Sequence, residues 1–375
     1  MNNEVWKRLL DPVPLIAIMF ALVIAVPTFA GEEPLHAVAP DAVEGVHAQD
    51  LNIASGDFDL ATTILMPEGA GPFPGIVMLP GSGPHPRSHS SAFAEAFAKA
   101  GLAVISFDKR GSGESSGNWI TSSIEDMAAD GLAAMRTLAA LPEVDSSRIG
   151  LWGPSQGAWI ATIMHTMTPD IAFIVAMSGG GVTRRRSEEY SYSRALEQLG
   201  ASPAEHERAD AILDAYFDWL AFGEGRDDLM AMIDVVKDEP WYQALQIDSV
   251  LPSDKNRPNW EWVATYDPLP TIETMNFPVL LLFGENDDQQ PTAEAAARWA
   301  EGLSKAGNVN VQTEIFTGAD HMLMVGDPSQ GHNRPRAERL FEIISAWLQV
   351  QTGIDTSSHW KYKTPTKLLE VQDTP

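Results

Sequence analysis

The stretch IGLWGPSQGAWIA, residues 149–161, places Ser155 between Gly153 and Gly157, where two sequence patterns meet. The residues before it, RIGLWG, are apolar and typical of a buried strand, whereas QGAWIATIMHTM after it is typical of a helix. A Gly-x-Ser-x-Gly motif at a strand-to-helix turn lets neighbouring backbone approach closely and lifts the serine Oγ out of the sheet. The helix start adds free N–H groups that favour developing negative charge. The motif predicts a nucleophilic serine; an ordinary Gly/Ser turn is the alternative.

A serine nucleophile needs a base, and the base needs an acid that orients it, in the chain order Ser, Asp or Glu, His. Two aspartates, Asp287 and Asp288, follow an apolar strand pattern in LLLFGENDDQQP. His321 follows the last strand pattern in TGADHMLM, and His332 lies in the polar loop beyond it. We favour Asp287 and His321 because each stands just after a strand end. Asp288 and His332 are the alternatives, and either aspartate could instead cap the helix expected near residue 292.

The same chemistry requires N–H donors for an oxyanion. The backbone N–H of Gln156, directly after the serine, is one candidate. The loop LPGSGPHPRSH, residues 79–89, follows an earlier strand, and its glycines allow backbone N–H groups to turn towards the site. We expect the second donor to be the N–H of Ser82, with Gly83 as the alternative.

Strand and helix patterns alternate along the chain from residue 73. Such alternation predicts an α/β fold with a mostly parallel sheet of about eight strands and helices on both faces. The first two strands are open to an antiparallel arrangement. Strands are expected at 47–55, 60–67, 74–80, 102–108, 148–153, 171–179, 278–284 and 309–316. Helices are expected at 91–101, 122–142, 156–167 and 334–350, with Ser123 capping the second of them.

The segment 182–276 interrupts the alternation with helical patterns and no convincing strand. A long helical insertion is expected to form a cap over the edge of the sheet where α/β folds bind ligands. Aromatic residues gather in it. Trp241, Trp260 and Trp262 are candidates for lining an acyl pocket, and forming the cap's own core is the alternative.

The N-terminal segment indicates where the protein is expected to be located, and the chain divides into a core and flanking segments. Lys7 and Arg8 precede an apolar run ending at Ala30, so residues 1–30 are expected to be a signal peptide for export, with an uncleaved membrane anchor as the alternative. Residues 31–45 are expected to form a linker and 351–375 a tail, which leaves 46–181 and 277–350 as the core.

A net charge of −26 makes nucleic acid an unsuitable partner, and the absence of cysteine excludes disulfides and thiolate metal sites. The sequence does not indicate an oligomeric state.

Several motifs together resemble the α/β-hydrolase superfamily, and more narrowly bacterial esterases related to the S9 (prolyl oligopeptidase) peptidases. They are PGSGP, FDKRGSGESSG, GPSQGAW, GENDDQQP and GADH, and the resemblance covers about residues 46–350. It implies a triad of Ser155, Asp287 and His321. The sequence departs from the family at Pro154, where His is frequent, and at Ala158, where a second Gly is common.

The expected function is carboxylesterase-type hydrolysis of a small-molecule ester through an acyl-enzyme, with no cofactor and no metal. The same triad would serve a peptidase or a thioesterase, and a non-catalytic, membrane-anchored binding protein is an alternative of another class. FDKRGSGESSG, residues 107–117, lacks the spacing of a phosphate-binding loop, so its charges are expected to brace the sheet edge. Glu188 and Glu189 suggest a site for a peptide amine, although a solvated helix start is the simpler interpretation.

Overall fold

The computed structural model describes residues 45–245 and 251–354, in which eight strands form one sheet of order β1-β2-β4-β3-β5-β6-β7-β8. β1 pairs antiparallel with β2, and β2 with β4, whereas all the other neighbours are parallel. The predicted eight-stranded, mostly parallel α/β fold is therefore confirmed. The strands are β1 (Val46–Ser55), β2 (Phe58–Pro67), β3 (Phe73–Met78), β4 (Ala103–Phe107), β5 (Val144–Pro154), β6 (Ile174–Met177), β7 (Val279–Gly284) and β8 (Val311–Phe316).

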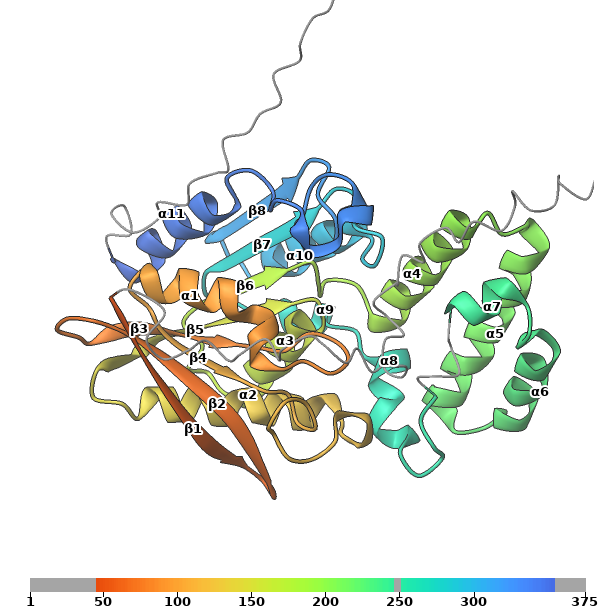
Figure 1. Ribbon diagram of the computed structural model, residues 1–375, viewed down its shortest axis with the longest axis horizontal. Helices are drawn as coiled ribbons and strands as arrows, with labels where there is room; N and C mark the ends of the chain where they lie inside the picture. Colours follow the sequence, from red (N-terminus) through yellow and green to blue (C-terminus); the bar gives the residue numbers. More distant parts are fainter. Residues whose placement is uncertain (1–44, 246–250, 355–375) are drawn as a thin grey trace, which may run out of the picture.

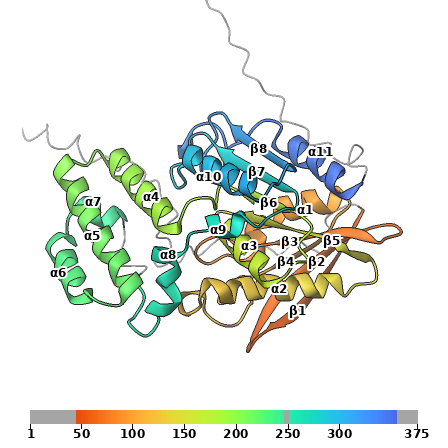
Figure 2. The same ribbon diagram turned by 180° about the vertical axis from the view of Figure 1, so that it is seen from behind.

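Helices cover both faces of this sheet (Figures 1 and 2). One face packs against α1 and α11 through Phe93, Phe97 and Trp347, and the other against α2, α3 and α10 through Met135, Trp159 and Trp299. The core helices are α1 (Ser91–Lys99), α2 (Ile124–Ala139), α3 (Gln156–Met167), α10 (Thr292–Lys305) and α11 (Leu340–Thr352). Short 3-10 helices are η2 (Arg87–Ser90), η3 (Trp119–Thr121), η5 (Arg257–Trp260) and η6 (Pro328–Asn333).

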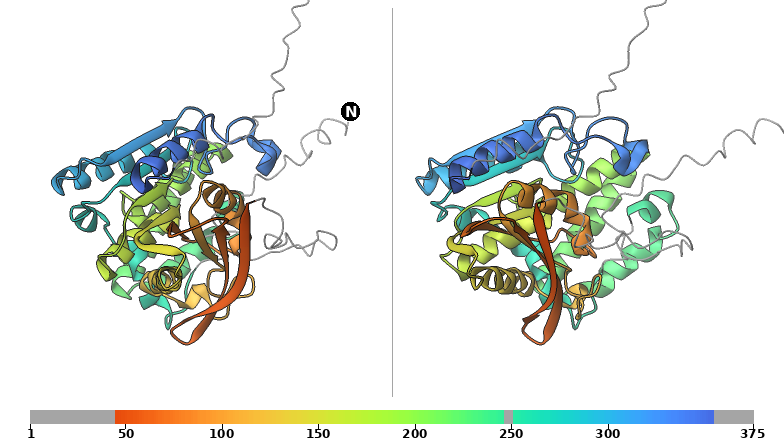
Figure 3. Two further views of the ribbon diagram at one scale, coloured as in Figure 1. Left: turned by 90° about the vertical axis from the view of Figure 1, so that its left-hand side faces the viewer. Right: turned by 60° about the vertical axis from the view of Figure 1, so that its left-hand side comes forward.

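The strands follow the burial that their sequences predict. Every residue of β4 and β7 is buried, because these apolar strands have helices on both faces. β1 is only partly buried, and Figure 3 shows it with β2 as a twisted hairpin along one side of the molecule. The N-terminus of α2 forms the predicted cap: the Ser123 hydroxyl accepts from Asp126 N–H, and the Asp126 carboxylate accepts from Ser123 N–H.

The closing helix begins later than predicted, at Leu340 instead of residue 334. Pro335 and Arg336 lie in an extended segment instead. The Pro335 carbonyl accepts from Val325 N–H, and Arg336 forms an antiparallel bridge with Met324. Strand-like pairing with Met324 and Val325, in the segment after β8, therefore overrides the helical pattern of this stretch.

The chain between β6 and β7 forms helices, with no strand in the part of it that the structure describes. Figure 1 shows four of these helices, α4 to α7, grouped in a lobe beside the sheet, with α8 near its border with the core. The helices are α4 (Arg184–Leu199), α5 (Pro203–Phe222), α6 (Arg226–Val236), α7 (Pro240–Leu245), α8 (Glu261–Thr265) and α9 (Leu269–Ile272). We call α4–α8 with η5 the cap.

The predicted signal peptide at 1–30 and most of the predicted linker and tail lie outside the described residues. Within the described residues, no helix is both long enough and apolar enough to cross a bilayer.

Backbone segments approach one another unusually closely where β5 and β6 end. An added Cβ at Gly179 would lie 2.1 Å from the carbonyl oxygen of Ser155, and one at Gly153 would lie 2.5 Å from that of Gly157. Both positions therefore require glycine because of the space around them.

We predict that Gly179→Ala lowers the free energy of unfolding by about 3 kcal/mol or more, because backbone cannot move aside as a flexible side chain can. Gly200→Ala is the control. Gly200 ends α4 at φ 70° with open space around it, so only backbone strain of about 1–2 kcal/mol applies. Urea unfolding of both variants measures the difference; equal losses would contradict the close approach.

Candidate active site

Ser155 occupies a sharp turn between β5 and α3. Its backbone lies at φ 50° and ψ −121°, a conformation that L-residues rarely adopt and that costs of order 1–3 kcal/mol. The turn is held by a 2.7 Å hydrogen bond from Ser155 N–H to the carbonyl of Met177 on β6. The side chain is partly exposed, at the carboxyl edge of the parallel strands and at the start of a helix. The structure thus places Ser155 where the motif predicts a nucleophile.

Asp287 and His321 come from the loops after β7 and β8 and form a buried pair. The Nδ1 of His321 lies 2.9 and 3.0 Å from the two carboxylate oxygens of Asp287. The N–H groups of Gln289 and Gln290 donate to Asp287 Oδ1 at 2.8 and 2.9 Å. These donors fix the carboxylate, which in turn selects the His321 tautomer that carries its proton on Nδ1.

The pKa of His321 is raised above its ordinary value of 6.5. Burial alone lowers it, but the Asp287 carboxylate stabilises the imidazolium and outweighs that cost, with Asp288 and Asp320 adding to the effect. Such a ring can hold a proton taken from a neighbouring hydroxyl.

The described residues include no hydrogen bond between the Ser155 hydroxyl and the His321 ring. The structure therefore brings two of the three predicted residues into contact and places the third at the same edge of the sheet. Catalytic hydrogen bonds are often long before substrate binds, so this separation is compatible with a triad.

The alternatives to this pair are placed differently. Asp288 is partly exposed and accepts a 3.3 Å hydrogen bond from Gln198 of the cap. Neither aspartate caps α10, whose N-cap position is Pro291. The side chain of His332 lies outside the described part of the chain.

The two predicted oxyanion donors lie on segments that contact each other. An added Cβ on Gly157, in the first turn of α3, would lie 3.3 Å from the carbonyl oxygen of Pro80 in the loop after β3. Within the described residues, the N–H groups of Ser82 and Gln156 donate to no other protein group. Gly83, the alternative to Ser82, has φ 69° and open space around it.

The charged segment 107–117 divides into two kinds of contact. Asp108 pairs with Arg87 at 2.7 Å, and Arg110 pairs with Asp130 at 2.6 Å, as expected of groups that brace the sheet edge. Lys109 instead reaches the candidate site, which the sequence analysis missed. Asp108, Lys109 and Arg110 follow a buried strand, and successive side chains of an extended segment point to opposite sides. This alternation was the sequence feature that could have indicated a different environment for Lys109.

The cap contacts the core on two sides of the molecule. On one side, the Tyr190 hydroxyl of α4 donates to the Asp287 carbonyl at 3.0 Å. On the other, Trp260 donates to the Ile120 carbonyl at 2.6 Å, and its ring centroid lies 6.2 Å from that of Trp119. The cap therefore contacts the core on both the Asp287 side and the Trp119 side.

The three candidate pocket tryptophans occupy different environments. Trp241 is buried within the cap, where it donates to Glu239 and packs against Arg208. Trp262 is also buried in the hydrophobic core. Only Trp260 is partly exposed at the border between cap and core.

The two glutamates that suggested an amine site are engaged within α4. Glu188 pairs with Arg184, and Glu189 with Arg185 at 2.7 Å. Arginines one helical turn earlier therefore engage both carboxylates, and the role of the two glutamates as an amine site stays a prediction.

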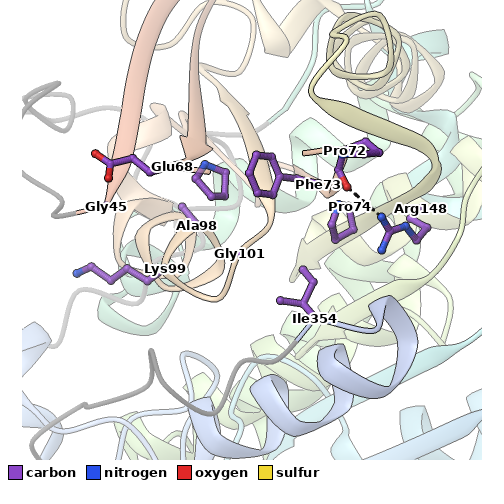
Figure 4. A pocket seen from close by; sticks show the side chains of 11 residues that line it. Gly45, Glu68, Pro72, Phe73, Pro74, Ala98, Lys99, Gly101, Arg148 and Ile354 are labelled. Atoms are coloured by element: carbon purple, nitrogen blue, oxygen red, sulfur yellow. Dashed lines mark hydrogen bonds between the residues drawn. The ribbon is translucent and has the colours of Figure 1, made fainter. Parts of the chain in front are cut away.

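A cavity of about 370 Å³ lies at the opposite edge of the sheet, and Figure 4 shows the side chains that line it. It lies beside the starts of β3 and β5, lined by Phe73, Pro74 and Arg148, and Arg148 donates to the Pro72 carbonyl at 3.0 Å. It is separate from Ser155, which follows the other end of β5.

The chain is similar to known proteins in sequence and in fold. Esterase EstD of Thermotoga maritima is 23% identical over 323 residues, which cover 82% of this chain and 69% of that protein. The Pyrococcus furiosus esterase Pf2001 superposes with a TM-score of 0.54 at 18% identity, over 82% of this chain and 92% of its own. A hypothetical protein, PA2218, of Pseudomonas aeruginosa superposes with a TM-score of 0.53 at 18% identity, over 84% and 96%. Residues 76–331, more than half of the chain, match the sequence profile of the alpha/beta hydrolase family, and the protein belongs to that family.

Proposed function

We propose that this protein is a serine hydrolase that cleaves carboxylic esters through an acyl-enzyme. The observation that carries the proposal is the buried Asp287–His321 pair, which lies at the same edge of the sheet as the strained turn of Ser155. Membership of the family supports hydrolysis, and the esterase names of two similar proteins, EstD and Pf2001, support esters as substrates.

In the proposed mechanism, Ser155 Oγ attacks the ester carbonyl while His321 Nε2 takes its proton. The carbonyl oxygen becomes an oxyanion and accepts hydrogen bonds from the N–H groups of Gln156 and Ser82. The C–O bond to the alcohol then breaks, and His321 gives its proton to the departing oxygen. Water, deprotonated by His321, attacks the acyl-enzyme and releases the acid. Asp287 holds the imidazole and stabilises its charged form in both steps.

The substrate class is tested with purified protein on p-nitrophenyl esters of graded chain length, beside aminoacyl amides and acyl thioesters. We expect esters to give the highest kcat/KM. A preference for amides or thioesters would reassign the same triad to a peptidase or a thioesterase. The absence of any turnover and of labelling by a fluorophosphonate would favour a binding protein.

Ser155→Ala is expected to abolish ester turnover, a loss on the order of 10⁶ in kcat, because it removes the nucleophile. Ser178→Ala is the matched control: this buried serine directly follows β6, and its hydroxyl has no hydrogen-bond partner among the described residues. Fluorophosphonate labelling followed by mass spectrometry reads out both variants. Labelling that persists in Ser155→Ala, or turnover within about tenfold of wild type, removes Ser155 from this role.

The proposed roles of Asp287 and His321 are tested by the effect of substitutions on kcat and by the pH dependence of kcat/KM. Asp287→Asn is expected to lower kcat by about 10⁴ through the wrong imidazole tautomer, and Asp288→Asn far less. His321 must be neutral to accept a proton, so kcat/KM rises with pH through the pKa of His321, which lies above 6.5 in the wild type. Without the Asp287 charge the pKa of His321 falls, because burial then meets less opposition, and the acid limb moves to lower pH.

A pH profile of kcat/KM from pH 5 to 9 for wild type and both variants measures this shift. The assignment is wrong if Asp288→Asn moves the acid limb and Asp287→Asn does not.

Trp260 is the cap tryptophan best placed to contact an acyl chain. Trp260→Ala is expected to lower kcat/KM for medium-chain esters about tenfold or more, since a large apolar contact is worth about 1.5–3 kcal/mol, and to leave the acetate ester nearly unchanged. Trp241→Ala is the control, because it removes cap core and should lower stability without changing the preference for chain length. Parallel profiles for wild type and Trp260→Ala would place the acyl pocket elsewhere.

A further inference from the structure

Lys109 is fully buried beside the candidate site, and among the described residues its Nζ contacts two carbonyl oxygens and an aromatic ring. Its Nζ donates to the carbonyl of Gly81 at 2.9 Å and to the side-chain Oε1 of Gln156 at 2.7 Å. It also lies 5.2 Å from the centre of the Trp119 ring, within cation–π range. Among the described residues, no carboxylate lies within ion-pair distance of it. Burial of an amino group without an ion-pair partner is costly, so the presence of Lys109 here requires an explanation.

The two hydrogen bonds of Lys109 join the two proposed oxyanion donors. The Gly81 carbonyl belongs to the same peptide group as the Ser82 N–H, so an ammonium on that oxygen draws electron density from the amide and strengthens the N–H as a donor. The other partner is the side chain of Gln156, whose own backbone N–H is the second donor. One side chain thus links the loop after β3 to the first residue of α3.

The peptide groups on both sides of Gly81 are fixed. Its N–H donates to His85 Nδ1 at 3.3 Å, and its carbonyl accepts from Lys109. His85 is neutral, because burial first and then the charges of His89 and Lys109 lower its pKa to about 3. With Nδ1 as acceptor, the Nε2 proton points to Ser90 Oγ, 3.2 Å away. The direction of the Ser82 N–H follows from these two restraints.

We propose that Lys109 is a positioning residue that orients and polarises the oxyanion donors, a role that rests on the proposed function. The oxyanion forms only in the transition state and the tetrahedral intermediates. Loss of Lys109 therefore weakens a contact that the bound ester does not yet make, and it lowers kcat while leaving KM unchanged.

The charge of Lys109 is sensitive to its surroundings. Burial, and next the positive charge of Arg184 on the cap, lower the pKa of Lys109 to about 7, while Asp130 acts in the opposite direction.

The test is Lys109→Met, which keeps the length of the side chain and removes its charge and donors. Fluorophosphonate titration counts active sites, so kcat is expressed per competent site. We expect kcat for p-nitrophenyl butyrate to fall about 10- to 100-fold, less than the 10²–10³ for loss of a whole donor, with KM within about twofold. The affinity for phenylboronic acid, which forms a tetrahedral adduct with the serine, should fall by a similar factor.

Arg110→Lys is the matched control, since it alters the neighbouring buried cation, which pairs with Asp130 and does not contact the oxyanion donors. It should lower the melting temperature and leave kcat per site unchanged. The inference is overturned if Lys109→Met keeps kcat per site within threefold of wild type, if KM rises instead, or if boronate affinity is unchanged.

If Lys109→Met does not fold, Gln156→Leu decides the question, because it removes one partner of Lys109 and keeps the backbone donor. A fall in kcat of about three- to tenfold at constant KM supports the role, and wild-type kcat refutes it. If the wild type cleaves no ester, the proposed substrate class fails separately. The fluorophosphonate labelling rate, which also places an oxygen against these donors, then tests Lys109: an unchanged rate in Lys109→Met refutes the inference.

Discussion

The end of β5, the first turn of α3 and the end of β6 converge at Ser155, and the rest of the site depends on this close approach. The residue sits at φ 50°, and its N–H is tied to Met177 on the adjacent strand. Gly153 and Gly179 allow backbone atoms of neighbouring segments to pass within distances that a Cβ would block. The paired strands hold this strain, and as a result the hydroxyl projects beyond the sheet at the start of a helix. The positions of the donors, the base and the cap are all defined relative to that point.

Buried charges organise the loop that follows β4. Although the chain is strongly acidic, its buried arginines at this edge each have a buried carboxylate: Arg87 has Asp108, and Arg110 has Asp130. Breaking such a pair leaves an uncompensated charge, so each resists movement of its segment. Lys109 lies between the two pairs in sequence, and the rigidity they provide keeps its ammonium directed at the carbonyl of the β3 loop.

Local patterns predicted the elements of this structure better than they predicted its contacts. The eight strands and the turn at Ser155 follow from apolar runs and glycine spacing, and the proximity of Asp287 to His321 could be anticipated because each residue follows a strand end. The alternation of charges could indicate that Lys109 faces another side, but it could not predict its partners, which lie 28 and 47 residues away in the sequence. The pairing of Glu188 with Arg184 was available from the sequence as a four-residue helical spacing, and it was overlooked. The late start of α11 depends on a bridge to Met324, again a contact outside the local window.

The cap enters the chain as one uninterrupted segment between two strands that are neighbours in the sheet. Its replacement by another segment would leave the order of the strands, the turn at Ser155 and the loops that carry Asp287 and His321 in place. Contacts between the cap and the core limit which segments could replace the cap. Tyr190 and Ser187 of α4 hydrogen-bond to the backbone beside Asp287, so a foreign segment must supply equivalent contacts. The helices α5 to α7 do not contribute to these contacts beside Asp287, so changes in them would leave the contacts in place.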